Sequence, residues 1–176
     1  MKLKLLIFLF STYSYLTNLI FLIIELLPPF LRFIFFKIAF KKLGSNSLID
    51  YKTYFRYPSK ISIGDNVAIN RGCEFYPSFL VNGGDITIGN NVVLSPNVKI
   101  YAIGHDSKTK SLDGIAGHVL IEDDVWIAAN SILLPNVRVG RGSVVGAGSV
   151  VTRDIPPNSI AIGAPARVIK KRFFRE

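Results

Sequence analysis

The sequence predicts an all-β fold, a parallel coil of short strands, preceded by a hydrophobic helical segment. Three observations predict it. An aliphatic residue recurs at every sixth position over much of the chain, the first forty residues are rich in apolar side chains, and two adjacent prolines divide that region into two stretches of helical length. The 176 residues suffice for one domain of ordinary size. We therefore expect residues 1–43 to form the helical segment and residues 44–176 to form the coil.

Composition and charge exclude several other classes. Apolar residues make up 49% of the chain and charged residues 19%, which is too apolar for a disordered chain or a solvated coiled coil. The single cysteine, Cys73, excludes an internal disulfide and a thiolate metal cage. The net charge is +9, and its excess lies at the two ends of the chain, in residues 1–60 and in the basic tail from Arg167. A nucleic-acid binder more often spreads its cations along one face, so no nucleic-acid partner is expected.

The N-terminal segment has the length and composition of membrane-associated helices. Residues 5–27 are long enough to span a bilayer and contain one charged side chain, Glu25. Pro28 and Pro29 end this helix, because neither ring nitrogen can donate a hydrogen bond. Residues 30–40 form a second apolar stretch with two basic residues, a pattern typical of a helix that lies at a membrane surface.

Three interpretations of this segment compete. A cleaved signal peptide requires a small-residue cleavage site soon after the apolar run, where this chain has Glu-Leu-Leu-Pro-Pro. A helical hairpin could instead pack on its own domain or on partner subunits. Membrane attachment, by a span or by interfacial helices, is the favoured interpretation. Because more basic residues follow the apolar run than precede it, the rest of the chain is expected in the cytoplasm, at the inner-membrane surface.

The six-residue repeat predicts the coil. The longest uninterrupted run of aliphatic residues at this spacing is Ile121, Ile127, Leu133, Val139, Val145 and Val151. This period fits neither an α-helix nor an alternating strand. It fits a coil in which each hexapeptide forms a short strand and a turn, with three hexapeptides closing one triangular rung. Residues eighteen apart should then stack: Ile121 over Val139, Ile127 over Val145, and Leu133 over Val151.

The same phase appears earlier in the chain, at Ile63, Ile69, Phe75 and Val81, and again at Ile88, Leu94 and Ile100. Cys73 occupies the small buried position four residues after Ile69, so it is expected to be a packed core thiol rather than a nucleophile. Both ends of such a coil have bare strand edges that need capping. The N-terminal segment and the C-terminal tail are the material available for this.

Residues 101–117 interrupt the repeat with a polar, glycine-rich excursion that predicts a loop projecting from a rigid scaffold. It contains His105, one of two histidines, and imidazole is the side chain best matched to removing a proton from a hydroxyl at neutral pH. Asp106, beside it, is a candidate to orient or polarise the ring. Composition alone leaves a solvated histidine without a role as the commoner alternative.

Four segments carry a resemblance to a known family. They are Gly104-His105-Asp106, IEDDVWIAA from Ile121, VVGAGSVVTRDIPPN from Val145, and IGAPARVIK from Ile162. The chain resembles the hexapeptide-repeat O-acetyltransferases, within them most closely the galactoside and maltose acetyltransferases and the capsule or O-antigen sugar acetyltransferases. The resemblance implies a left-handed parallel β-helix, acetyl-CoA as co-substrate without a metal, a homotrimer, and a sugar or glycan acceptor.

The resemblance also implies roles for individual residues. His105 matches the general base, which takes the proton from an acceptor hydroxyl that attacks the thioester directly. The residues matched to the coenzyme A site, in a groove between coils of neighbouring subunits, are Trp126, Ala128, Ala129, Ala147, Thr152, Arg153, Arg167 and Lys170. Trp126 would line the pantetheine channel, and the basic residues would meet phosphates. Asn70 and Asp85 match acceptor-binding positions. Without the resemblance, Trp126 would be interpreted as an ordinary surface or interface packing residue and Arg153 as a solvated charge.

The chain departs from the family pattern in places. Ala128 follows Trp126-Ile127 where the family usually has glycine, and the excursion after His105 is shorter than in the galactoside enzymes. His118 matches no catalytic position and is expected to be a structural loop residue.

The leading hypothesis is an acetyl-CoA-dependent O-acetyltransferase that modifies a polysaccharide or lipid-linked glycan. A xenobiotic acetyltransferase is an alternative, although such enzymes typically carry a tryptophan shortly after the loop histidine. A non-catalytic β-helical scaffold is another alternative. A zinc hydratase would need three histidines for each metal ion, and this chain has two.

Overall fold

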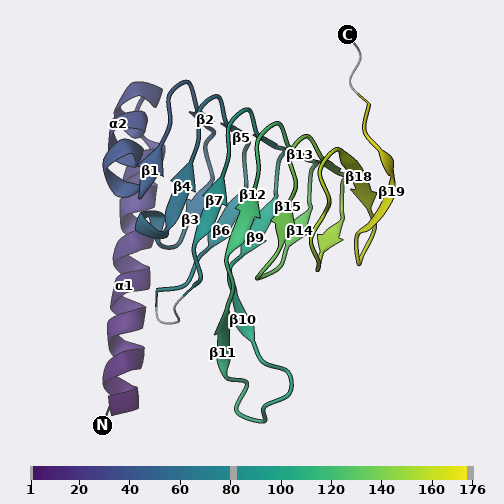
Figure 1. The fold of residues 1–176 in the computed structure, drawn as a ribbon. Helices are drawn as coiled ribbons and strands as arrows, with labels where there is room; N and C mark the ends of the chain where they lie inside the picture. The colour runs from purple at the N-terminus through teal and green to yellow at the C-terminus, as the bar shows by residue number, and fades with distance from the viewer. Residues whose placement is uncertain (1, 80–82, 174–176) are drawn as a thin grey trace. The chain divides into compact units, whose positions relative to one another are not determined.

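The computed structural model describes residues 2–79 and 83–173 (Figure 1). The chain divides into two compact units between Phe35 and Phe36. Two helices form at the N-terminus, as the sequence predicts: α1 (Lys2–Glu25) and α2 (Pro29–Ala39). The chain turns at the two prolines between them. An ion pair of 3.6 Å between Glu25 and Arg32 joins the end of α1 to the start of α2.

Helix α1 exposes most of its apolar side chains. Residues 8–25 form a window of 18 residues with a mean hydropathy of 1.4, of which 6% is buried. By length and composition this one helix could cross a membrane, a test that a signal sequence near an N-terminus also passes.

The rest of the chain forms the predicted coil, which has three sheets of parallel strands. Sheet 1 contains β1 (Lys42–Leu43), β4 (Ile61–Ile63), β7 (Ile86–Ile88), β12 (Val119–Ile121) and β15 (Arg138–Val139). Sheet 2 contains β2 (Leu48–Ile49), β5 (Ala68–Ile69), β8 (Val93–Leu94), β13 (Trp126–Ile127), β16 (Val144–Val145), β18 (Ser159–Ile162) and the antiparallel β19 (Arg167–Lys171). Sheet 3 contains β3 (Tyr54–Phe55), β6 (Glu74–Tyr76), β9 (Lys99–Tyr101), β14 (Ile132–Leu133) and β17 (Val150–Val151). A short 3-10 helix, Pro58–Lys60, precedes β4.

The strand register confirms the predicted stacking. Ile121 pairs with Val139, Ile127 with Val145, and Leu133 with Val151. All six side chains are fully buried, with 0% of their surface exposed. The hexapeptide period therefore builds continuous aliphatic ladders inside the coil, and burial of these ladders is the main stabilising contribution.

The coil begins at β1, before Ile63, the first repeat position identified from the sequence. Leu43, Ile49 and Phe55 are buried and six residues apart, and they form a complete first rung. The next strands keep the same sheet order, with Ile49 over Ile69 and Phe55 over Phe75. Val81, a predicted repeat position, lies outside the described residues.

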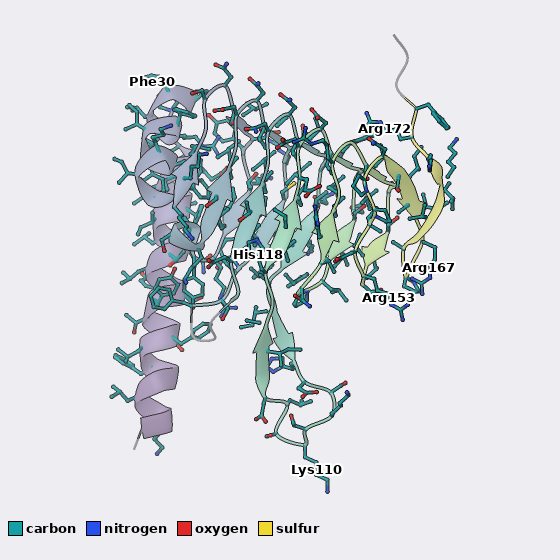
Figure 2. All side chains as sticks on the ribbon, viewed as in Figure 1. Phe30, Lys110, His118, Arg153, Arg167 and Arg172 are labelled. Atoms are coloured by element: carbon teal, nitrogen blue, oxygen red, sulfur yellow. The ribbon has the colours of Figure 1, made fainter. Side chains whose placement is uncertain are left out.

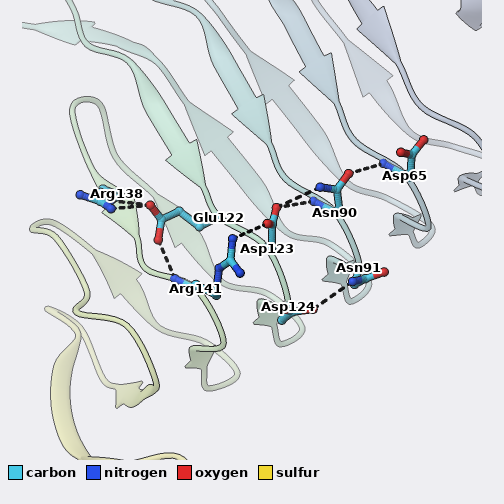
Figure 3. A network of polar contacts seen from close by, with 8 residues as sticks. All are labelled: Asp65, Asn90, Asn91, Glu122, Asp123, Asp124, Arg138 and Arg141. Carbon is cyan, nitrogen blue, oxygen red and sulfur yellow. Dashed lines mark hydrogen bonds and ion pairs between the residues drawn. The ribbon is translucent and has the colours of Figure 1, made fainter.

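The chain turns a corner after each sheet: corner A joins sheets 1 and 2, corner B joins sheets 2 and 3, and corner C joins sheets 3 and 1. At corner A, equivalent residues of successive rungs bond to one another (Figure 3). The side-chain amides of Asn66 and Asn91 lie 3.1 Å apart, and Asn91 donates to Asp124 at 3.0 Å. All three residues have positive φ, a conformation that asparagine and aspartate tolerate better than most residues.

Both ends of the coil are capped, as its bare edges require. At the start, the rings of Phe36 and Phe40 contact Phe55, which stacks on Phe75 with 4.6 Å between ring centroids. At the other end, β19 runs antiparallel along the last parallel strand of sheet 2. Arg172 then donates hydrogen bonds to two backbone carbonyls at corner A. The prediction that the C-terminal tail caps the coil is therefore confirmed.

Candidate functional site

The predicted loop is a two-stranded arm that leaves the coil at corner C (Figure 1). Strand β10 (Ile103–His105) pairs antiparallel with β11 (Gly114–Ala116). A hydrogen bond of 3.0 Å from the Gly117 amide to the Ala102 carbonyl closes its base. His118 is exposed where the arm rejoins the coil, and Lys110 lies at the tip (Figure 2). The arm holds its residues in register without burying them in the core.

His105 ends β10 and is exposed, and its ring orientation is fixed by the backbone. Its Nδ1 lies 2.6 Å from the carbonyl oxygen of Leu112. Because a carbonyl oxygen can only accept a hydrogen bond, Nδ1 carries the proton in the neutral ring. Nε2 then bears the lone pair, which is the form that a general base requires.

Leu112, which supplies this carbonyl, has φ of 49°. A bulky residue rarely adopts this left-handed conformation, and such strain is often found at functional sites. The Leu112 side chain is exposed, so core packing does not account for its conformation.

The expectation that Asp106 orients the histidine ring is wrong. The Asp106 carboxylate accepts a hydrogen bond of 2.9 Å from the Lys108 amide, and its carbonyl accepts one from the Thr109 hydroxyl. These contacts shape the turn at the tip of the arm. The group that meets the ring is the Leu112 carbonyl, because the antiparallel pairing brings residues 105 and 112 together.

Four of the predicted coenzyme residues lie on sheet 2 or at corner B. The Trp126 indole is 46% exposed on the outer face of β13, and its Nε1 donates to the Ser95 hydroxyl at 2.9 Å. Ala128 is buried at the end of this strand, Ala129 is half-buried, and Ala147 is exposed one rung further along. The indole is therefore held in place, with small side chains beside the corner that follows it.

Thr152 and Arg153 are exposed at corner C, after β17. Arg153 and Arg167 line one pocket of about 270 Å³ together with Asp154, Ile155, Pro156, Ala166 and Val168. Figure 2 shows both arginines at the C-terminal end of the coil. Two arginines outnumber the one aspartate in this lining, and guanidinium groups suit an anionic ligand such as a phosphate. Lys170 is exposed in β19 and does not line this pocket.

The two predicted acceptor residues lie at different corners. At corner B, the Asn70 side-chain amide donates a 2.7 Å hydrogen bond to the Leu94 carbonyl of the next rung. At corner C, the Asp85 carboxylate lies 3.5 Å from the Lys41 ammonium and 3.4 Å from that of Lys60. Sequence reasoning missed these lysines. Lys41, Lys60 and Asp85 each stand directly before a strand of sheet 1. This shared position is the sequence signal that could have identified the two lysines.

Cys73 is a core thiol, as the sequence predicts. It is fully buried, and its Sγ lies 3.3 Å from the Ser95 carbonyl oxygen. Burial raises the pKa of the Cys73 thiol to about 11, so the reactive thiolate is scarce at neutral pH. Within residues 2–79 and 83–173, no three His, Cys, Asp or Glu side chains are grouped to hold a metal ion.

The fold and the site together define a parallel β-helix protein with an exposed histidine on a two-stranded arm and a pocket lined in part by two arginines. The family model for bacterial transferase hexapeptide repeats matches residues 118–153. The chain is 38% identical over 141 residues to galactoside O-acetyltransferase of Escherichia coli (strain K12), covering 77% of this chain and 66% of that protein. It thus spans just under two thirds of that relative's length.

Solved structures agree with this match. A hexapeptide-repeat acetyltransferase from Vibrio cholerae O1 biovar eltor, complexed with acetyl coenzyme A, superposes with a TM-score of 0.82 and 28% identity, over 93% of this chain and 89% of that one. A galactoside acetyltransferase in complex with coenzyme A has a TM-score of 0.80 and 32% identity, over 92% of this chain and 81% of that one. The chain therefore belongs to the hexapeptide-repeat acetyltransferases, and the predicted left-handed parallel β-helix is confirmed.

Proposed function

We propose that this chain is an acetyl-CoA-dependent O-acetyltransferase that modifies a sugar hydroxyl, with His105 as the general base. The observation that carries the proposal is the 2.6 Å contact between His105 Nδ1 and the Leu112 carbonyl, which leaves Nε2 as the proton acceptor. Two of the most similar structures hold acetyl coenzyme A or coenzyme A, and the Escherichia coli relative is a galactoside O-acetyltransferase.

The proposed reaction is a direct transfer. Nε2 of His105 takes the proton of the acceptor hydroxyl while the hydroxyl oxygen attacks the thioester carbonyl carbon. The carbon–sulfur bond then breaks, and the departing coenzyme A thiolate takes the proton back from the imidazolium. The Leu112 carbonyl oxygen stabilises the positive ring while it exists, because Nδ1–H donates to it throughout.

The pocket lined by Arg153 and Arg167 is proposed to bind the coenzyme A phosphates through these two side chains, with Lys170 on β19 as a further contact. Trp126, Ala128, Ala129, Ala147 and Thr152 are proposed to line the rest of the coenzyme site. The double variant Arg153→Gln/Arg167→Gln is expected to raise the Kd for coenzyme A more than tenfold in isothermal titration, because charge-assisted bonds contribute roughly 1.5–3 kcal/mol each. A wild-type protein that does not bind coenzyme A would instead support the non-catalytic scaffold.

A homotrimer is proposed because one chain keeps the two halves of the site apart. Trp126 and the alanines lie on sheet 2 and at corner B, whereas His105, Thr152 and Arg153 lie at corner C, with sheet 3 between them. Corner C of one subunit can meet corner B of the next, and three such contacts close a ring. Sedimentation equilibrium is expected to give three times the chain mass of 19.5 kDa. A monomer that transfers acetyl groups at full rate would contradict this arrangement.

The acceptor is proposed to be a sugar of a polysaccharide or lipid-linked glycan, of the capsule or O-antigen type. The apolar α1 supports this choice, because such glycans are assembled on membrane lipids. Acetyl-CoA with a panel of free and lipid-linked sugars should yield an acceptor that has gained one acetyl group by mass spectrometry. Acetylation of antibiotics but not of any sugar would favour the xenobiotic alternative.

Membrane attachment through α1 is proposed as well, at the cytoplasmic face of the inner membrane. Leu16 and Ile20 are 50% and 45% exposed on this helix. The full-length protein is expected to float with vesicles containing anionic lipid, and Leu16→Lys/Ile20→Lys to lose most of this binding, since a lysine at the centre of a membrane helix costs about 2.5–3.5 kcal/mol. Truncation is the poorer test, because removing Phe36 and Phe40 opens the first rung. Equal flotation of both proteins would make α1 a packing element.

A further inference from the structure

Two lysines and one aspartate form an ion-pair cluster at corner C. Lys41 and Lys60 precede β1 and β4 on the first two rungs of sheet 1, and both ammonium groups lie within 3.5 Å of the carboxylate of Asp85, which precedes β7 on the third rung. The Lys41 side chain is 59% exposed and that of Lys60 33%. One carboxylate cannot neutralise two ammonium groups, so this ion-pair cluster keeps a net positive charge that faces solvent.

Aromatic rings border the same cluster. The Lys60 ammonium lies 5.9 Å from the centroid of the Phe79 ring, and the Arg56 guanidinium lies 5.4 Å from that of Tyr57. The two rings are 5.8 Å apart, and Phe79 is 63% exposed. An exposed ring beside cations, here that of Phe79, offers an apolar surface for the C–H face of a sugar ring together with charges for an anionic group.

The cluster adjoins the arm that carries His105. The Val119 amide, where the chain returns from the arm, donates a 3.1 Å hydrogen bond to the Asp85 carbonyl. His105 lies three residues beyond Ala102 at the base of the arm, which is about 10 Å along an extended strand. A sugar hydroxyl at His105 and a charged group at the lysines therefore suit one acceptor of a few sugar units or one substituted sugar.

We propose that Lys41 and Lys60 form a subsite for an anionic group of the acceptor, a sugar carboxylate or a sugar phosphate. Asp85 acts as a positioning residue, because it holds the two ammonium groups on one side of the corner. The Asp85 carboxylate thereby contributes to acceptor binding through the two lysines rather than by contacting the acceptor itself. This inference rests on the proposed acetyltransferase function and adds the substrate class: an acidic sugar.

The test compares acetyl transfer from acetyl-CoA to glucuronic acid, glucose 6-phosphate and glucose, with the full-length protein. The wild type is expected to show a kcat/KM at least about tenfold higher for a charged sugar than for glucose, because one charge-assisted hydrogen bond contributes enough binding energy for a tenfold difference. Whichever charged sugar is preferred identifies the carboxylate or the phosphate as the group bound. Lys41→Gln and Lys60→Gln should each reduce this preference severalfold through KM of the charged sugar, with KM of acetyl-CoA unchanged.

Lys171→Gln is the matched control, because it removes the same charge at an exposed position of β19, beside Ser159 near corner A at the other end of the coil, and should keep the preference. Equal rates for charged and neutral sugars, or a preference that survives the double lysine variant, would overturn the subsite. If no sugar is acetylated at all, the proposed function fails. Binding of glucuronic acid and glucose 6-phosphate by NMR titration then decides the subsite separately: lysine-dependent binding supports it, and its absence overturns it.

Discussion

Replacement of His105 by alanine is expected to lower kcat for acetyl transfer by about 10²–10⁴-fold, the contribution of a positioned general base. The side chain is exposed at the end of β10, so its loss leaves the coil intact and the affinity for coenzyme A within about twofold of the wild type. Initial rates measured by thiol release, together with isothermal titration of coenzyme A, check both parts of this prediction.

His105→Asn separates proton transfer from local structure. An asparagine amide can still donate to the Leu112 carbonyl, but it has no basic atom, so we expect a loss of kcat similar to that of the alanine variant. His118→Ala is the matched control at the base of the arm and should keep the wild-type rate, since His118 is assigned no part in the reaction. A His105→Ala protein that folds, binds coenzyme A and transfers at full rate would remove His105 from the mechanism.

Ile121→Ala is expected to have the largest effect on folding, a loss of about 2–5 kcal/mol in the free energy of unfolding. Ile121 has 0% of its surface exposed and pairs with Ile88 on one side and Val139 on the other. Removing its side chain leaves a cavity at two interfaces between rungs, and stability in a repeat protein depends on such interfaces. Urea unfolding followed by circular dichroism measures the change.

Leu120→Ala is the control from the same strand. Leu120 points outward, is half-buried, and lies next to Ile121 in β12, so its truncation should cost about 1 kcal/mol or less. A similar loss for both variants would mean that the ladder inside the coil is not the main source of stability.

Much of the fold follows from one period in the sequence. The spacing from Ile121 to Val151 predicts which residues pair, and the register agrees at all three tested positions. The first rung was missed although Leu43, Ile49 and Phe55 keep the six-residue spacing. Residues 56–60, which include a short 3-10 helix, shift the phase before the next rung, and an aromatic residue replaces the aliphatic one at position 55.

The candidate site was less predictable than the fold, because it depends on backbone geometry. His105 was recognised in the excursion, but the two strands around it were hidden by polar and glycine residues. The sequence offers the neighbouring Asp106 as a candidate partner of the ring, whereas the ring donates its hydrogen bond to a backbone carbonyl seven residues away. No side-chain pattern marks Leu112 as left-handed. By contrast, counting hexapeptides from Ile63 assigns Asn70 to corner B from the sequence alone.

The hydrogen bond that fixes His105 has a consequence for how proteins of this kind can diverge. Its acceptor is a main-chain oxygen, which every amino acid supplies. Exchanges of side chains at the tip of the arm therefore leave the tautomer of His105 unchanged, provided that the turn keeps its shape. Under the proposed mechanism, the arm can thus accumulate substitutions that suit new acceptors while Nε2 of His105 keeps its lone pair, so acceptor preference can evolve separately from the proposed base.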